Sequence, residues 1–393
     1  MNGFGRALRA EWALDPAGTY LNHGTVGATP RRVLAAQQAI RDEIQRHPAR
    51  YLLRELADVK QIAMRARPRM RVAADAVAAF LGARGEDLVF VDNATAGVNA
   101  VLRSLRLEPG DEILLTDHGY GSVGHVARHV AGLAGARVVT APLPWPRWEP
   151  EAIVEAVAGA LGPRTRLAVV DQVTSPTGLL LPVAAIAARC RAAGVLVLVD
   201  GAHGPGALDF AIPDLGGDWY TGNLHKWAMA PISAAVLWAR PERQRDLHPP
   251  AISWGYGLDF AAEFDLQGTR DPSAWLAAPE GLAFMRDLGL EAMRAWNHRL
   301  AWEAARGLAD RWGVELPQDE SQVGCMAAVP LPARFGTTAA DGHGLKDALL
   351  YEDGIEAQVH AFRDRLFWRL SAQVYNEPED FERAARAIER RAG

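Results

Sequence analysis

Short apolar runs alternate with stretches of helical periodicity along the first two thirds of the chain. The runs are rich in valine and leucine and lie at 88–91, 112–116, 137–141, 166–170, 195–199 and 234–238. Continuous apolar runs of this length are typical of strands that are buried on both faces. The stretches between them, such as 95–106, 149–161 and 183–193, have the spacing of helices. This alternation predicts an α/β fold built on a mostly parallel sheet.

The pattern differs at the two ends of the chain. Residues 31–47 and 55–82 have helical periodicity and precede the first strand-like run. Beyond residue 255, a long helical stretch at 274–312 is followed by strand-like runs at 324–329, 355–360 and 366–371 and by a helical stretch at 378–391. We therefore expect an N-terminal arm at 1–19, a large α/β domain at 20–255 and a smaller α+β domain at 256–393.

Charge and composition narrow the class of protein. The 393 residues carry a net charge of −5 and are 49% hydrophobic, which is ordinary for a globular chain and argues against a nucleic-acid partner. No uncharged apolar run reaches about 18 residues, so we expect no membrane span. The first residues contain no apolar signal-peptide core, which predicts a cytoplasmic location. Cys190 and Cys325 stand in apolar surroundings and are expected to be buried structural thiols.

Lysine is rare in this chain. The 42 basic residues include lysine only at Lys60, Lys226 and Lys346, so arginine supplies nearly all of the positive charge. Lys226 lies in the segment "TGNLHKWAMAP", between a histidine and a tryptophan. Arginine does not lose its proton in proteins, whereas a lysine can supply a neutral amine. A lysine retained at this position is therefore a candidate for chemistry that uses its amine.

Polar residues follow several of the predicted strands. Asp200 ends the run at 195–199, a polar turn at 171–178 follows the run at 166–170, and the small-residue turn that ends at Thr95 opens a helix. The segment "DHGYGS" at 117–122 follows another strand and contains two rings that could stack on a planar ligand. Ligands of open parallel sheets bind at the carboxyl ends of the strands, so these residues are expected to share one site.

The chemistry of a single cofactor would use all of these residues. Pyridoxal phosphate needs a lysine for a Schiff base, a carboxylate at its pyridine nitrogen, a phosphate-binding helix start and a ring that stacks on it. Taken alone, a helix cap, a turn or a loop histidine has an ordinary structural reading. Asp200 and Lys226 at strand ends, with the helix start at Thr95 and the polar turn at 171–178, together predict a pyridoxal-phosphate site.

The chain resembles the class V aminotransferase family of fold-type I pyridoxal-phosphate enzymes. The resemblance runs from about Tyr20 to the end and rests on "YLNHGTVGATP", "TSPTG", "VDGAHGPG", "NLHKW" and "RLSAQVYN". Among members, these segments are most similar to isopenicillin N epimerase-type proteins, which are related to cysteine desulfurases. The resemblance implies a large cofactor-binding domain with a mostly parallel sheet and a smaller α+β domain.

The resemblance also implies roles for individual residues around the cofactor. Lys226 would form the Schiff base, Asp200 would pair with the pyridine nitrogen, and His118 would stack on the ring, with Tyr120 as a rival. The residues expected near the phenolic oxygen are His203 and Ser175, and those expected at the phosphate are Ala94, Thr95, Asn223 and His225.

Further roles concern the substrate and a second subunit. Arg369 matches an arginine that holds the substrate α-carboxylate through a bidentate fork, and His23 is expected to reach the substrate. Gly268 and Thr269, in the predicted interface segment 265–275, resemble residues that reach the phosphate of a partner subunit's cofactor. This implies a homodimer with shared sites.

The expected reaction takes place at the α-carbon of an amino-acid substrate, through an external aldimine and a carbanion. Epimerisation is the first expectation, and β-elimination, as in C–S or sulfoxide lyases, or transamination are the alternatives. Cysteine desulfurases carry a nucleophilic cysteine shortly before the carboxylate-binding arginine, but the stretch 356–368 has none, so a cysteine-dependent desulfurase is not expected. A non-catalytic regulatory relative that binds the cofactor is a further alternative. A nucleotide-binding protein would need a glycine-rich fingerprint that this chain lacks.

Overall fold

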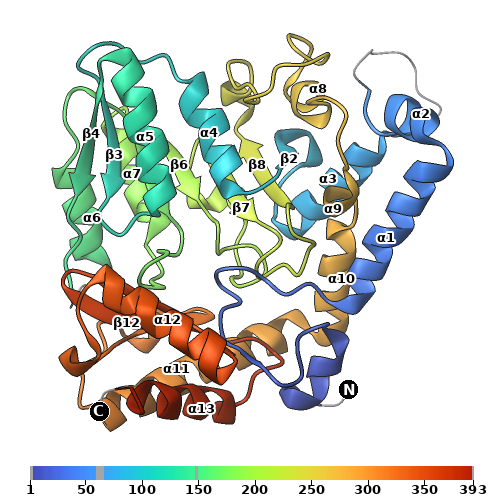
Figure 1. The fold of residues 1–393 in the computed structure, drawn as a ribbon. Helices are drawn as coiled ribbons and strands as arrows, with labels where there is room; N and C mark the ends of the chain where they lie inside the picture. The colour runs from blue at the N-terminus through green and yellow to red at the C-terminus, as the bar shows by residue number, and fades with distance from the viewer. Residues whose placement is uncertain (1–2, 59–65, 147–148, 392–393) are drawn as a thin grey trace.

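The computed structural model describes residues 3–58, 66–146 and 149–391 and is organised around a seven-stranded sheet (Figure 1). The strand order is β2-β8-β7-β6-β5-β3-β4, in which β8 runs antiparallel to both of its neighbours and the other pairs are parallel. The strands are β2 (Leu88–Val91), β3 (Glu112–Thr116), β4 (Arg137–Ala141), β5 (Thr165–Asp171), β6 (Leu196–Asp200), β7 (Trp219–Asn223) and β8 (Ala235–Ala239). The predicted α/β fold with a mostly parallel sheet is confirmed.

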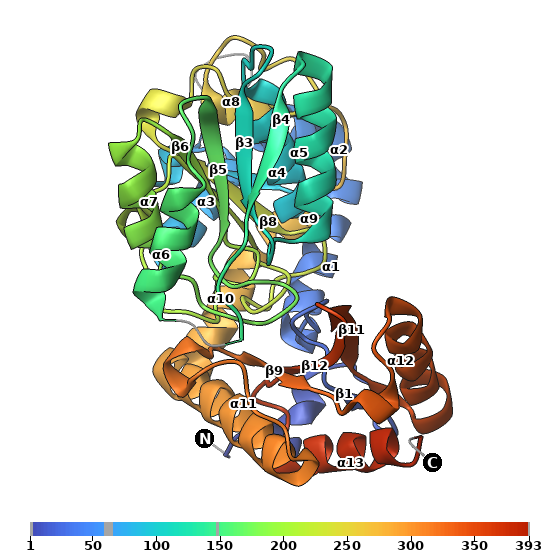
Figure 2. The ribbon, with the colours of Figure 1, turned by 90° about the vertical axis from the view of Figure 1, so that its left-hand side faces the viewer.

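Helices cover both faces of this sheet, as Figure 2 shows for α4 and α5 on one side and α6 and α7 on the other. One layer contains α4 (Ala94–Ser104), α5 (Gly121–Ala134) and α8 (Phe260–Asp265), and the opposite layer contains α3 (Arg69–Phe80), α6 (Pro150–Gly159) and α7 (Val183–Ala192). The helices α1 (Arg31–Arg46), α9 (Ser273–Leu276) and α10 (Ala278–Leu288) pack on one another beside α3, and the single turn α2 (Pro48–Arg50) follows α1.

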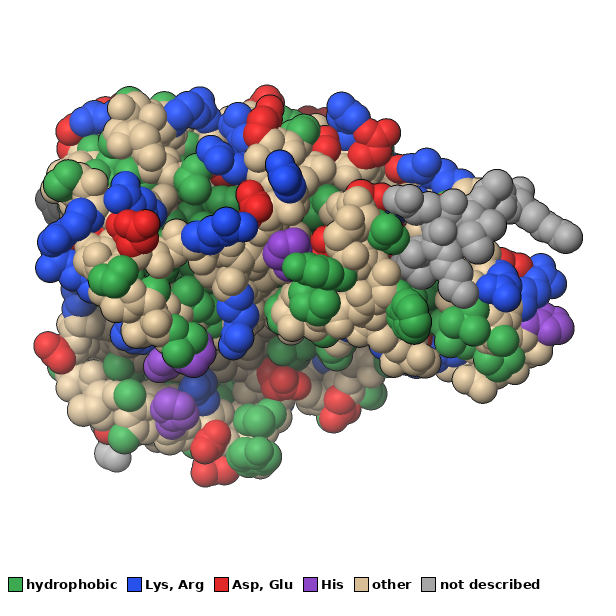
Figure 3. Space-filling view, turned by 90° about the horizontal axis from the view of Figure 1, so that it is seen from above, with side chains coloured by type: hydrophobic (Ala, Val, Ile, Leu, Met, Phe, Trp, Pro, Cys, Tyr) green, Lys and Arg blue, Asp and Glu red, His purple; other side chains and the backbone are tan. Residues whose placement is uncertain are grey.

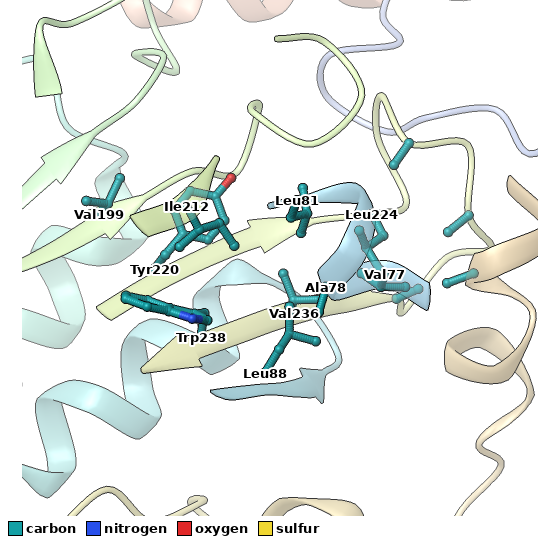
Figure 4. Close-up of a cluster of buried hydrophobic side chains, with 14 of the residues drawn as sticks. Val77, Ala78, Leu81, Leu88, Val199, Ile212, Tyr220, Leu224, Val236 and Trp238 are labelled. Carbon is teal, nitrogen blue, oxygen red and sulfur yellow. The ribbon is translucent and has the colours of Figure 1, made fainter. Parts of the chain in front are cut away.

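Burial on both faces explains the continuous apolar runs. In β6, Val197 and Val199 belong to the core under α3 and α7, whereas Leu198 belongs to the core under α4 and α5. Neither face of the strand meets water, so the residues at both odd and even positions along the strand are apolar. Figure 4 shows the first of these cores, where Val199, Tyr220 and Trp238 from neighbouring strands lie in one cluster.

A smaller antiparallel sheet lies below the large one in Figure 1. Its order is β11-β12-β9, with β9 (Met326–Pro330), β11 (Gln358–Phe362) and β12 (Arg365–Ser371). The helices α11 (Leu290–Trp312), α12 (Ala339–Asp353) and α13 (Pro378–Glu389) enclose a separate core with it. The short strand β1 (Thr19–Tyr20) pairs with β10 (Ile355–Glu356), so the N-terminal segment reaches this part of the molecule. The domain bounds 1–19, 20–255 and 256–393 remain predictions.

The structure differs from the predicted elements at three places. The stretch 274–312 is divided into α9, α10 and α11, and Gly289, with a φ of 89°, ends α10 and begins α11. The run at 355–360 is divided into β10 and β11. The strand β7 was not predicted, because its "WYTGN" sequence contains Gly222 and Asn223, which are uncommon in strands. Part of the helical stretch at 55–82, with Lys60, lies outside the described residues.

Two composition-based expectations can be compared with the structure. Cys190 and Cys325 are both buried and unpaired, as predicted. No helix within 3–58, 66–146 and 149–391 is long and apolar enough to cross a membrane. The face in Figure 3 has basic and acidic side chains interspersed over its surface, which agrees with the scattered charges of the sequence.

Candidate active site

The carboxyl ends of β6 and β7 bring Asp200 and Lys226 into one buried site. Asp200 is the last residue of β6, and Lys226 follows β7 by three residues. The carboxylate of Asp200 accepts the N–H of Ala202 at 3.0 Å. Burial raises the pKa of Asp200, while this hydrogen bond and the positive charge of Lys226 lower it. The two residues are therefore close enough to influence each other's charge, as a cofactor that spans them would require.

The surroundings of Lys226 make its amine easier to deprotonate than that of an exposed lysine. Burial and then the charge of Arg369 lower the pKa of Lys226 to about 7. Lys226 Nζ lies 3.4 Å from His203 Nε2, and the indole N–H of Trp227 donates to His203 Nδ1 at 3.4 Å. Because an indole only donates, neutral His203 carries its own proton on Nε2 and donates it to Lys226. Burial holds the pKa of His203 well below its ordinary value, which is consistent with this neutral tautomer.

The start of α4, where the phosphate residues are predicted, lies beside Asn223. The Asn93 side chain caps the helix by accepting a first-turn N–H at 2.9 Å, and Asn223 Oδ1 accepts the N–H of Ala94 at 2.8 Å. Thr95 therefore presents its N–H and hydroxyl at the positive end of the helix. His225 donates from Nδ1 to a backbone carbonyl at 3.0 Å, and burial and the nearby Lys226 lower the pKa of His225 to about 4. The structure thus gathers all four predicted phosphate residues.

His118 and Tyr120 occupy different surroundings. His118 is wholly buried, and its Nδ1 lies 3.0 Å from Thr177 Oγ1. Its ring lies edge-on to Trp145, with centroids 5.1 Å apart, and is tilted against Phe362 at 4.5 Å. Burial lowers the pKa of His118 to about 4, so the ring is a neutral imidazole. Tyr120 is 47% exposed, and the choice between His118 and Tyr120 as the ring that stacks on a cofactor remains open.

Arg369 lies on β12 and reaches the large sheet from the smaller one. Its Nη1 donates to the Ser175 carbonyl at 2.6 Å, and its Nη2 donates to Thr25 Oγ1 at 2.7 Å. Within the described residues, the buried Nε atom has no hydrogen-bond partner. Burial lowers the pKa of Arg369 to about 10, against the opposing influence of the Tyr120 phenol. A substrate carboxylate would supply the acceptor that Nε needs. Ser175, predicted near the phenolic oxygen, thus contributes its carbonyl to this arginine.

His23 contacts the backbone of Lys226. Its Nε2 lies 3.0 Å from the Lys226 carbonyl, and its Nδ1 lies 2.8 Å from the Tyr375 hydroxyl. The same N-terminal loop packs tightly on this segment. A Cβ on Gly27 would lie only 2.3 Å from the His225 carbonyl oxygen, so a larger residue would not fit there. Burial lowers the pKa of His23 to about 4, so it is a neutral connector in this structure. Contact between His23 and substrate remains a prediction.

Gly268 and Thr269 lie in the loop between α8 and α9. Gly268 has a φ of 102°, and Thr269 is exposed. The next residue, Arg270, forms an ion pair with Asp92 and lies 4.1 Å over the ring of Trp275. The loop is therefore anchored next to the start of α4, whereas its role toward a second subunit remains a prediction.

Three residues of the site were not identified from the sequence. Thr25 bonds to Arg369, and Trp145 and Phe362 pack on His118. Thr25 lies in the "HGTVG" segment that carried the family resemblance, so that motif could have indicated it. Trp145 lies in a loop after β4 and Phe362 ends β11, and only the packing of the smaller sheet on the larger one brings them together.

Comparison with known proteins defines the class. The sequence profile of the family "Aminotransferase class-V" matches residues 19–348, and the chain belongs to this family. The chain is 35% identical to isopenicillin N epimerase from Streptomyces clavuligerus, over 98% of each protein. It is 32% identical to a probable chloroplastic L-cysteine desulfhydrase from Arabidopsis thaliana, over 95% of this chain and 83% of that protein.

Solved structures support the fold. The cystine C–S lyase C-DES, in a mutant with glycine covalently linked to its pyridoxal-phosphate cofactor, has a TM-score of 0.81 at 21% identity, over 97% of this chain and 99% of that one. The cysteine desulfurase CsdA from Escherichia coli has a TM-score of 0.76 at 22% identity, over 99% and 98% of the two chains. The fold is that of fold-type I pyridoxal-phosphate enzymes, and pyridoxal 5′-phosphate is the cofactor of this family.

The residues present fit this cofactor. Lys226 provides a buried amine with a lowered pKa, and Asp200 is a buried carboxyl with no ion pair to another described residue. The capped start of α4 provides donors for a phosphate. Each of these polar groups costs free energy when it is buried without a partner. The aldehyde, the pyridine nitrogen and the phosphate of the cofactor would supply partners for Lys226, Asp200 and the start of α4, respectively.

Proposed function

We propose that the protein is a pyridoxal-phosphate enzyme that moves the α-proton of an amino-acid substrate, with epimerisation or racemisation as its reaction. The observation that carries this proposal is the buried amine of Lys226, which lies within electrostatic reach of Arg369 and Asp200 and whose pKa is lowered to about 7, first by burial and then by Arg369. The bound cofactor would supply an electron-withdrawing ring to the substrate α-carbon. Lys226 would take the α-proton at Nζ, and Arg369 would hold the carboxylate through Nε and the adjacent Nη.

Epimerisation also needs a group that returns the proton to the opposite face. His203 lies against Lys226 Nζ and therefore belongs to the same side as the lysine. Tyr120 is the better candidate, because its phenol is exposed and lies within electrostatic reach of Arg369. The relatives named isopenicillin N epimerase support this branch.

A β-eliminating lyase is the second candidate. The relatives named L-cysteine desulfhydrase support it. Elimination requires Lys226 and a substrate with a β-leaving group, and it needs no acid on the opposite face. A cysteine-dependent desulfurase has less support, because residues 358–371 form a hairpin that contains no cysteine.

Incubation with panels of amino acids in deuterated water separates these functions. Deuterium at the α-carbon with mixed chirality supports epimerisation, whereas release of ammonia and a keto acid supports elimination. A Tyr120→Phe variant that keeps α-exchange but gives one enantiomer would support Tyr120 as the second acid. Protein that binds the cofactor without exchanging any amino acid would support the non-catalytic regulatory reading and overturn both enzyme proposals.

We further propose a homodimer. The loop before α8 exposes large apolar side chains, with Trp254 81%, Tyr256 58% and Ile252 56% exposed. Exposed aromatic residues are enriched at protein interfaces. Light scattering on the purified protein would measure the mass, and a monomer at micromolar concentration would contradict the proposal. The cytoplasmic location remains a prediction.

A further inference from the structure

A second buried carboxyl lies beside Asp200. Asp171 ends β5 as Asp200 ends β6, and the two residues are direct partners in the parallel register. Val169 and Leu198, two residues before them, both belong to the core under α4 and α5. Side chains two residues apart in a strand share a face, so both carboxyls point to this side of the sheet. Asp171 is 5% exposed and Asp200 is 4% exposed.

No described cation neutralises Asp171. It accepts the backbone N–H of Tyr120, and no lysine, arginine or histidine among the described residues forms an ion pair with it. Lys226 acts on Asp200, and the neighbouring Asp117 pairs with Arg363.

The other titratable groups on this side do not offer Asp171 a positive charge. His118 is neutral because its pKa is lowered to about 4 by burial. Tyr220, on β7, belongs to the core on the opposite face and is a neutral phenol, because burial and then the charge of Asp200 raise its pKa well above the ordinary value. Arg128, on α5, is solvent-exposed and lies against His125. Asp171 and Asp200 are therefore two desolvated carboxyls without a cation between them.

A cavity connects Asp171 with the surface. Its volume is about 200 Å³, and its lining includes Asp171, Thr116, Asp117, Tyr120 and Arg128. This volume has room for several water molecules, since one occupies roughly 30 Å³ in the liquid. The absence of a side chain at Gly119 keeps the space open, because a Cβ there would lie 3.5 Å from Asp171 Oδ2 and 3.8 Å from Thr116 Oγ1. That hydroxyl is buried and has no hydrogen-bond partner among the described residues.

We propose that Asp171 holds a proton in the folded protein at neutral pH, so that Asp200 can be the anion of the pair, and that the cavity exchanges this proton with solvent. Two neighbouring buried carboxyls on one face of a sheet cannot both ionise at low cost, as paired aspartates in other proteins show. The role of Asp200 toward the pyridine nitrogen rests on the proposed function. The protonation of Asp171 does not, because it follows from the register of β5 and β6, the burial of both carboxyls and the lack of a described cation beside Asp171. Asp171 is thus a positioning residue for the charge on Asp200.

The pKa values agree with this arrangement. Burial and then the charge of Asp200 raise the pKa of Asp171 well above its ordinary value. An acid with a raised pKa in the folded state keeps its proton while the unfolded chain loses it, so stability declines as pH rises from about 4 towards the folded pKa. Asparagine is the neutral isostere of a protonated aspartate and does not titrate.

Thermal unfolding of the full-length protein tests the proposal. Asp171→Asn should raise the melting temperature relative to the unsubstituted protein, and the gain should be at least about 2 °C larger near pH 8 than near pH 5. The control Asp310→Asn, at an exposed position on α11, should give no pH-dependent gain. A gain that is constant with pH, or an Asp171→Asn protein that is destabilised or unfolded at neutral pH, would overturn the proposal, because either result means that the anion is the native form.

Infrared spectroscopy gives a second readout that does not depend on activity. The cofactor-loaded protein in deuterated water at neutral pH should show the C=O stretch of a protonated carboxyl that disappears in Asp171→Asn. A spectrum without a band sensitive to this substitution would contradict the proposal. Neither measurement involves turnover. A protein that fails every amino-acid assay could therefore still confirm the proton on Asp171, so failure of the proposed function and failure of this proposal can be told apart.

Discussion

The two halves of the candidate site are built in different ways. The half on the large sheet places Asp200 and Lys226 just after strands whose backbones are fixed on both sides by neighbouring strands. The half on the smaller sheet is one hairpin, β11–β12, whose side chains reach across to the large sheet. The first half is determined by strand order, whereas the second depends on how two separate cores pack together.

The β11–β12 hairpin shows which contacts hold the half of the site on the smaller sheet against the large sheet. Its turn has only two residues, Arg363 and Asp364, both with positive φ (47° and 56°), which is the geometry of a tight type I′ turn. Arg363 pairs with Asp117 and donates to the Leu143 carbonyl at 3.1 Å, while Phe362 covers His118. The tip of this hairpin is therefore a short contact between the two sheets.

The largest predicted effect concerns the half on the large sheet. Lys226→Ala removes both the covalent attachment and the proposed base, so amino-acid α-exchange should fall by at least about 10⁴-fold. Borohydride should no longer fix the cofactor to the protein. The matched control is Lys346→Ala on α12, which should behave as the unsubstituted protein. Retention of covalent labelling in Lys226→Ala would remove the basis of the proposed site.

The second-largest effect is expected at Arg369, and a substitution there tests whether the smaller sheet binds the substrate. Arg369→Lys keeps a positive charge but loses the planar fork, so KM should rise about 10- to 100-fold with a smaller change in kcat. The exposed Arg334→Lys, in the short 3₁₀ turn at Ala333–Phe335 after β9, serves as control. An equal fall in kcat with no change in KM would mean that Arg369 supports the fold rather than the carboxylate.

The pH dependence of cofactor loading links the two halves. The pKa of Lys226 is lowered to about 7 by burial and then by Arg369. Neutral amine is needed for attack, so apo-protein should capture pyridoxal phosphate about tenfold more slowly per pH unit below that value and at a constant rate above it. In Arg369→Met the midpoint should move to higher pH, because a positive charge is lost. An unchanged midpoint would show that the two halves do not interact electrostatically.

The smallest predicted effect concerns the hairpin tip. The ion pair between Arg363 and Asp117 is partly exposed, so Arg363→Ala should change KM by less than about fivefold. The double variant with Asp117→Ala should be less than additive if the contact holds the hairpin in place. Additive effects of the two substitutions would show that the hairpin is positioned by Phe362 and Trp145 instead.

Strand order explains why much of the site could be predicted. Asp200 ends an unbroken apolar strand, so its place at the ligand-binding edge of the sheet was readable from the pattern, whereas its pairing with Lys226 was inferred from the chemistry of the cofactor. The strand β7 was missed because its glycine and asparagine weaken the strand signal. The division of 274–312 was also missed, because periodicity continues on both sides of Gly289.

Contacts between distant segments could not be read in the same way. Phe362, at the end of β11, packs on His118 and Trp145 from more than 200 residues away in the chain, and neither Trp145 nor Phe362 carries a local signal. The distance between His203 and Lys226 also required coordinates, although both residues were named from the sequence.

The sequence by itself determined the alternation of strands and helices, the residues at the strand ends and the chemistry that Asp200 and Lys226 can support together. These features depend on periodicity and on which side chains interrupt it, and both are local. Only the tertiary structure decided that Asp171 lies beside Asp200, that Lys226 is desolvated near Arg369, and that a hairpin from a second core closes over His118. Those properties depend on register and burial, which arise when segments distant in the chain pack together.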